Sequence, residues 1–132
     1  MPTTTATFTL NTSEFTGGGT ISKTTNLNKA GTATGIDQFT GVSRVYTAAA
    51  TNDISIAAAS AYTDSQAGKI YIKNTTNTDV TSYLLVEVGS NVIVGRLYPG
   101  DWLFIPYDGT EDIKVSTSAA NMYYEYAIFH EG

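Results

Sequence analysis

Apolar and polar residues alternate along the second half of the chain, between residues 69 and 129. Side chains of a β-strand point to opposite faces in turn, so a period of two residues predicts strands with one buried face. The residues that share a face of their strand are Ile70 with Ile72, Leu84 with Val86 and Val88, Ile113 with Val115, and Tyr124 with Tyr126 and Ile128. Long helical periodicity is absent from the sequence.

The run Pro99-Gly100-Asp101 interrupts this alternation. Proline favours the start of a turn, glycine accepts a positive φ, and an aspartate side chain can hydrogen-bond within its own turn. We therefore expect a corner in an antiparallel sheet. The strand that follows carries the only tryptophan, Trp102, and is expected to end at Pro106.

Turn residues separate the other apolar segments. Strands are expected at residues 42–46, 54–56, 69–74, 82–88, 92–97, 101–105, 112–117 and 122–129. We also expect a turn at residues 51–53. The alanine-rich residues 57–61 are the one place where a short helix could form, and a helix of that length is marginal on its own. Short strands with regular turns are typical of sandwiches and barrels. The predicted fold class is all-β, an antiparallel jelly-roll-like β-sandwich that occupies residues 36–132.

Residues 1–35 are rich in threonine and glycine and poor in apolar anchors. Ala6, Phe8 and Leu10 alternate with threonines and predict one short strand. Two interpretations stay open for this segment. It is either an edge strand of the domain or an N-terminal arm that orders against a neighbouring subunit.

Composition limits the function classes. The chain has 132 residues, no cysteine, a net charge of −5 and scattered basic residues, which argues against disulfides and against binding nucleic acid. No apolar stretch approaches the ~20 residues that span a bilayer. The first residues lack the basic start and apolar middle of a signal peptide. We expect a soluble protein that is made in the cytoplasm and is not bound to a membrane.

No set of residues predicts catalysis or a bound cofactor. His130 is the only histidine and lies near the C-terminus, a poor place to hold a catalytic imidazole. The carboxylates of Asp101, Asp108, Glu111 and Asp112 cluster in sequence, but their spacing matches no calcium loop and suits turn formers. We expect no catalytic residue, no cofactor and no metal ion.

Aromatic residues are dense after residue 97. Trp102 and Phe104 alternate with Leu103 and Ile105, so this strand is apolar on both faces and is expected in the core or under a partner subunit. The residues expected at interfaces are Trp102, Phe104, Tyr98, Tyr107, Tyr123, Tyr124, Tyr126, Phe129, Phe8 and Leu10. The alternative is a sugar-binding platform that exposes Trp102, Tyr98 or Tyr107 on a concave face.

Two resemblances accompany these patterns. The run YPGDWLFIP partly resembles the cupin pattern, a glycine–aspartate turn followed by a proline. Cupins are jelly rolls that hold a metal through histidines, and the strands around this run contain none. The shared fold is therefore expected here, without the metal site.

A closer resemblance covers residues 69–129. The segments KIYIKNTT, YLLVEVGSNVIVGRL, YPGDWLFIP and DIKVSTSAANMYYEYAIF resemble small virion structural proteins of tailed bacteriophages, with Gly100-Asp101-Trp102 and Glu125-Tyr126 as the most specific residues. The resemblance implies a non-enzymatic β-sandwich subunit of the capsid decoration or cement type, located in the virion. It also implies self-association as trimers or dimers and attachment to the major capsid protein or other virion subunits. The alternative is a carbohydrate- or receptor-binding module of a phage fibre or tail.

Overall fold

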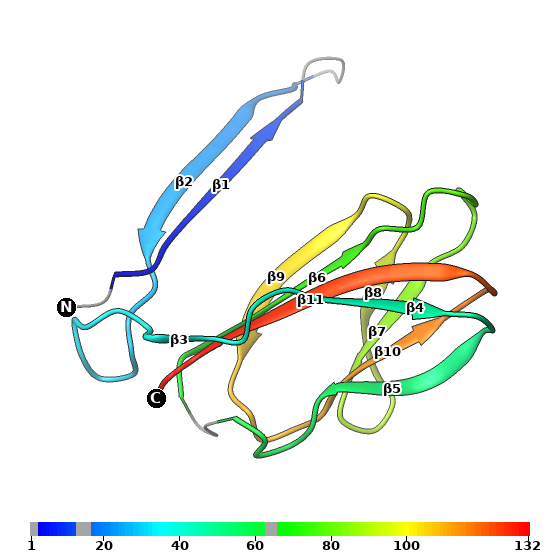
Figure 1. Cartoon of the computed structure of the whole chain (residues 1–132). Coiled ribbons are helices and arrows are strands. Elements are labelled where there is room, and N and C mark those ends of the chain that lie inside the picture. Colours follow the sequence, from blue (N-terminus) through cyan, green and yellow to red (C-terminus); the bar gives the residue numbers. More distant parts are fainter. Residues whose placement is uncertain (1–2, 13–16, 63–65) are drawn as a thin grey trace.

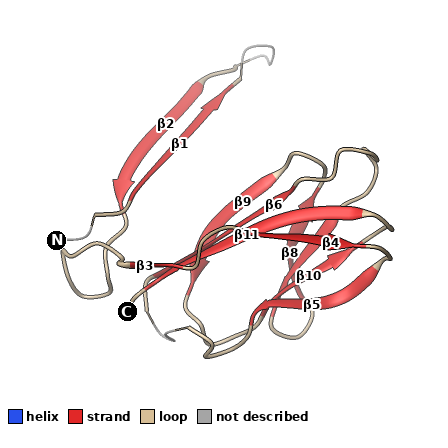
Figure 2. Cartoon of the chain, viewed as in Figure 1, coloured by secondary structure: helices blue, strands red, loops and turns tan. Residues whose placement is uncertain are grey.

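The computed structural model describes residues 3–12, 17–62 and 66–132 of the chain. These residues contain eleven β-strands, joined by loops and turns, and no helix (Figure 2). The strands are β1 (Thr5–Asn11), β2 (Thr20–Asn26), β3 (Gln38–Phe39), β4 (Ser43–Thr47), β5 (Thr51–Ala57), β6 (Gly68–Asn74), β7 (Leu84–Val88), β8 (Val92–Leu97), β9 (Trp102–Tyr107), β10 (Ile113–Thr117) and β11 (Met122–His130). The predicted all-β class is confirmed.

Two antiparallel sheets form the body of the molecule (Figure 1). The first sheet has the strand order β5-β10-β7-β8. In the second, β11 is central: it pairs with β3 and β4 on one side and with β6 on the other, and β9 forms the edge beyond β6. This arrangement is consistent with a β-sandwich.

The hydrophobic core draws on both sheets. The fully buried apolar side chains include Ile70, Ile72, Leu84, Val86, Val115, Met122, Tyr124 and Ile128. They alternate with more exposed residues along β6 and at the start of β7, as the two-residue period predicts. The predicted inward faces are therefore confirmed, and the opposite faces of the same strands are left for contacts outside the core.

The predicted corner before β9 is present. Gly100 has φ +91°, and its amide donates to the carbonyl of Asn74 over 2.9 Å. The carboxylate of Asp101 accepts the amide of Tyr98 at 3.0 Å, which closes the turn. The expected end of the strand at Pro106 is wrong, because β9 continues to Tyr107. A proline is tolerated there since β9 is an edge strand, where an amide is not required on the open side.

Two local predictions around β5 are also wrong. Residues 51–53 belong to β5, where the amides of Thr51 and Asp53 donate to the hydroxyls of Thr117 and Ser116. Asp53 has φ +54° next to a shift in the β5–β10 register, so the turn-forming residues make an irregular strand instead. The alanine-rich residues 57–61 form no helix, since Ala57 ends β5 and Ser60 has φ +59°.

The N-terminal residues form a separate hairpin. The strand predicted around Phe8 is confirmed as β1, and it pairs with β2, a strand the sequence did not predict. Among the described residues β1 pairs with no strand of the two large sheets, so the edge-strand alternative is wrong. Residues 1–2 and 13–16 of the predicted N-terminal segment lie outside the described part. Threonine pairs such as Thr7 with Thr24, 3.0 Å apart, link the two strands.

Candidate binding surface

Seven aromatic side chains gather on the outer face of the second sheet. Directly paired residues of an antiparallel sheet lie on the same face. The register pairs Phe39 with Phe129, Tyr46 with Tyr123, and Tyr71 with Phe104, while Trp102 lies beside Phe104 on β9 and opposite Lys73. We call this surface the aromatic face; it consists of Phe39, Tyr46, Tyr71, Trp102, Phe104, Tyr123 and Phe129.

The rings of the aromatic face contact one another. Phe39 stacks on Phe129 with ring centroids 4.7 Å apart, and Phe104 meets Phe129 edge-on at 6.1 Å. Tyr46 and Tyr123 lie 4.9 Å apart. Despite these contacts, Phe39 remains 55% exposed, Tyr46 51% and Tyr123 44%. The part of the face over β3, β4 and β11 is therefore open to solvent. Phe39 and Phe129 lie at one end of it and Tyr46 and Tyr123 at the other, and the ion pair of Arg44 and Glu125 lies between them.

The other residues expected at interfaces divide into two groups. Phe8, Leu10 and Tyr98 are exposed, and Tyr98 lies 5.6 Å from Tyr83 between ring centroids. In contrast, Tyr107 and Tyr124 are buried core residues, so their side chains are not available to a partner. The expectation for Tyr124 is wrong because the two-residue period that directs Ile128 inward also directs Tyr124 inward. The expectation for Tyr107 is wrong because it continues the inward face of Leu103 and Ile105 on β9. Tyr126 is half-buried and packs against the same core.

A cleft of about 930 Å³ lies between the hairpin and the β6–β9 part of the aromatic face. The hairpin side contributes Ala6, Thr7, Phe8, Lys23, Thr25 and Leu27, and the sheet side contributes Lys69, Tyr71, Lys73 and residues 102–106. Phe8 meets Trp102 edge-on, with ring centroids 6.1 Å apart. Trp102 is still 49% exposed, so its indole is accessible from the cleft.

Polar contacts hold the centre of the aromatic face. The hydroxyl of Tyr71 donates to the carboxylate of Glu125 over 2.8 Å, and Arg44 lies 3.6 Å from the other carboxylate oxygen. Burial, the hydrogen bond and the charge of Glu125 raise the pKa of Tyr71 to about 12. Tyr71 therefore remains a neutral donor at physiological pH, and Glu125 is already engaged by two partners.

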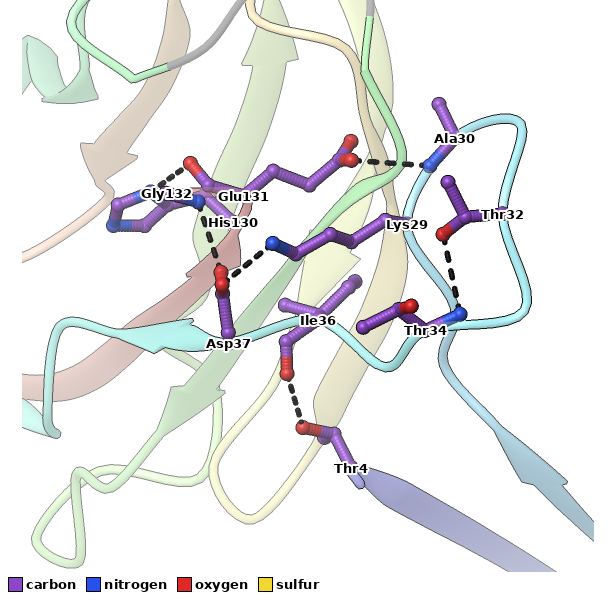
Figure 3. A network of polar contacts seen from close by, with 10 residues as sticks. All are labelled: Thr4, Lys29, Ala30, Thr32, Thr34, Ile36, Asp37, His130, Glu131 and Gly132. Atoms are coloured by element: carbon purple, nitrogen blue, oxygen red, sulfur yellow. Dashed lines mark hydrogen bonds and ion pairs between the residues drawn. The ribbon is translucent and has the colours of Figure 1, made fainter. Parts of the chain in front are cut away.

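A polar network fixes the base of the hairpin to the C-terminus (Figure 3). The carboxylate of Glu131 accepts the amides of Ala30 and Ala67 at 3.1 and 2.9 Å. Asp37 forms an ion pair with Lys29 and accepts the amide of Gly132. The hydroxyl of Thr4 donates to the carbonyl of Ile36 (Figure 3). These contacts fix the base of the hairpin relative to the two large sheets. They therefore help to determine the width of the cleft between the hairpin and the sheet.

The residues weighed for catalysis or metal binding have structural roles. His130 packs against Tyr62 with ring centroids 4.8 Å apart. Asp101, Asp108 and Asp112 accept backbone amides of neighbouring turns, and within the described ranges no three His, Cys, Asp or Glu side chains form a group able to hold a metal ion. No helix of the described residues has the length and apolar character of a membrane span.

The chain was compared with protein-family models, curated proteins and solved structures. No match was found in any of the three. The proposed function below is therefore based on the aromatic face and the cleft.

Several residues of this surface were not predicted. Lys69, Tyr71 and Lys73 alternate with Ile70 and Ile72, so the two-residue period places all three on the outer side of β6. That signal was present in the sequence. The pairing of β6 with β9 was not, and only this pairing places Lys73 opposite Trp102.

Proposed function

We propose that the protein is a non-enzymatic structural subunit that works through self-association, as a capsid decoration or cement protein of a virion. The observation that supports this most strongly is the open part of the aromatic face. Phe39, Tyr46 and Tyr123 are each more than 40% exposed on one side of one sheet. Aromatic residues and arginine are enriched at protein interfaces.

The edge strand β8 supports the same proposal. Val92, Ile93 and Val94 are 61%, 61% and 45% exposed, and β8 pairs only with β7 among the described strands. An exposed apolar edge strand is prone to pair with another chain, and proteins that stay monomeric protect such edges. A neighbouring subunit that covers β8 removes this exposure.

The hairpin β1–β2 supplies the arm in this proposal. Nearly all of its strand residues are exposed, and an isolated two-stranded hairpin has marginal stability in water. Contact with a neighbouring subunit would stabilise it. The jelly-roll-like strand order, the assembly into trimers or dimers, and the attachment to the major capsid protein or other virion subunits belong to the same proposal.

Sedimentation velocity on surface variants tests the proposal. Tyr123→Lys places a charge on the open part of the aromatic face without removing a core residue. We expect it to shift the protein from an oligomer to a monomer. Val80→Lys is the matched control, since Val80 is 83% exposed in a loop outside the face, and this variant should remain oligomeric. A wild-type monomer, or an oligomer that Tyr123→Lys leaves intact, contradicts the proposal as stated.

A second candidate function is carbohydrate or receptor binding, as in a fibre or tail module. The observation that favours it is the half-exposed indole of Trp102 in the cleft. Aromatic faces that remain accessible in a concave site suit the C–H faces of sugars. Quenching of Trp102 fluorescence by an oligosaccharide tests this function, and silence across a broad glycan panel contradicts it.

A further inference from the structure

Basic residues concentrate in the cleft of an otherwise acidic protein. The chain has seven lysines and arginines against twelve aspartates and glutamates. Three of the seven, Lys23, Lys69 and Lys73, line the cleft, and none of its described lining residues is acidic. Glu125 lies opposite Lys73 in the sheet register, but Tyr71 and Arg44 already engage its carboxylate. The cleft is therefore a locally positive site.

Aromatic rings line the same cleft. Trp102 and Phe104 lie side by side on β9, Tyr71 lies opposite Phe104 on β6, and Phe8 approaches Trp102 from the hairpin. The hydroxyl-bearing residues Thr7 and Thr25 also line the hairpin side. The volume of about 930 Å³ is within the usual range of roughly 300–1,000 Å³ for small-molecule sites.

We infer that this cleft binds an oligosaccharide that carries carboxylate groups. The sugar rings stack on Trp102 and the neighbouring aromatic side chains, and the carboxylates pair with the lysine ammonium groups from both walls. This inference rests on the second candidate function and adds the charge class of the ligand. It concerns the β6–β9 part of the aromatic face and leaves the part over β3, β4 and β11 for self-association.

Other anions fit the cleft less well. Binding of a long nucleic acid depends on lysines and arginines that neutralise many phosphates. The protein has a net charge of −5, so it repels such a polyanion outside the cleft. An acidic peptide brings an amide and a carbonyl at every residue, and these groups need partners when they are buried. The β6 backbone under the cleft is paired on both sides, with β9 and β11, so only the open edges of β9 and of the hairpin could supply such partners. An acidic peptide is therefore included among the probes below.

Isothermal titration calorimetry on the full chain tests the inference with a matched pair of probes. The first probe is tetragalacturonate, and the second is its fully methyl-esterified form, which has the same sugar rings without the negative charge. We expect tetragalacturonate to bind with quenching of Trp102 fluorescence and with weaker affinity at high salt. We expect the ester to bind at least about tenfold more weakly, since it forms no charge-assisted hydrogen bonds.

Lysine variants identify the site. The double variant Lys23→Gln and Lys73→Gln should weaken tetragalacturonate binding at least about tenfold and reduce its salt dependence. Lys114→Gln is the control, because Lys114 lies on β10 in the other sheet, and it should bind as the wild type does. Wild-type affinity in the double variant overturns the assignment of the lysines.

The remaining outcomes separate the inference from the function on which it rests. Equal binding of the ester and the acid overturns the charge inference and leaves carbohydrate binding standing. Failure of both oligosaccharides to bind overturns the charge inference, and silence across the broad glycan panel then decides separately against carbohydrate binding. Tighter binding of a polyglutamate peptide than of tetragalacturonate overturns the inference in favour of an acidic protein segment.

Discussion

The ring of Phe8 on the hairpin and the indole of Trp102 on β9 meet edge-on, with centroids 6.1 Å apart and planes inclined by 66°. The hairpin shares no backbone sheet with the body in the described part of the chain. This side-chain contact therefore links the hairpin to the aromatic face above the cleft. It also brings the only tryptophan of the chain to the place where a ligand or a neighbouring subunit would be detected.

Phe8→Ala should expose Trp102 without unfolding the body. We expect the emission of Trp102 to shift to longer wavelength and its quenching by acrylamide to increase, because one side of the indole loses its cover. Loss of the aromatic pair should lower the free energy of unfolding by about 0.5–1.5 kcal/mol, in addition to the loss from the buried part of the Phe8 ring. Leu10→Ala is the control, since Leu10 is equally exposed on the same strand. Unchanged quenching in Phe8→Ala would show that the hairpin does not contact Trp102 in solution.

Tyr124→Phe should leave the protein as stable as the wild type or more stable by about 1 kcal/mol. The hydroxyl of Tyr124 is buried and has no hydrogen-bond partner among the described residues, and burial raises its pKa to about 12. Tyr107→Phe is the matched variant, because the Tyr107 hydroxyl donates to the carbonyl of Ala58 over 3.3 Å. It should cost about 0.5–1.5 kcal/mol in urea unfolding. A clear loss of stability in Tyr124→Phe would mean that its hydroxyl is hydrogen-bonded.

Asn74→Ala should destabilise the fold by about 2–3 kcal/mol, since a buried polar group left without a partner costs ~1–3 kcal/mol. The Asn74 side chain is fully buried, donates to the carbonyl of Leu97 over 2.9 Å and accepts the amide of Thr76 at 3.0 Å. Urea unfolding measures the effect. Asn77→Ala, in an exposed loop, is the control and should change stability little. Equal stability of the two variants would contradict the role of Asn74.

Asp37→Asn should lower stability at neutral pH and lose its effect in acid. The hydrogen bond from Lys29, and then that from the amide of Gly132, lower the pKa of Asp37 below its usual value. A lowered folded-state pKa contributes stability above the unfolded-state value of about 3.9, and this contribution is lost as the pH falls through the folded-state pKa. The urea midpoints of the wild type and Asp37→Asn should therefore differ at neutral pH and converge in acid. A difference that is constant down to low pH would exclude this linkage.

The inward faces of the strands could be predicted from the sequence because burial has a local signature. Ile70, Ile72, Val86 and Val115 repeat at the strand period, and each is fully buried. The strand β2 lacks that signature: Ile21 is 49% exposed, and cross-strand contacts to β1 rather than a core support it. The alanines of residues 57–61 have a high intrinsic preference for helix, but in the folded protein Ala57 ends β5 and the residues after it form a turn.

The candidate site was harder to predict because it depends on strand pairing. The sequence indicated that Trp102 and Phe104 share a face, and the structure confirms this. It did not indicate that Lys73 lies opposite Trp102, or that the hairpin brings Phe8 and Lys23 over both. These contacts join residues far apart in the chain, and their register is set by the whole sheet.

Sedimentation equilibrium of the wild-type chain tests the central proposal most directly. We expect a single species with the mass of two or three chains. Its formation should depend on the open aromatic residues Phe39, Tyr46 and Tyr123. A species with the mass of one chain at about 100 µM, roughly a hundredfold above a Kd of about 1 µM, would contradict self-association as the function of this protein.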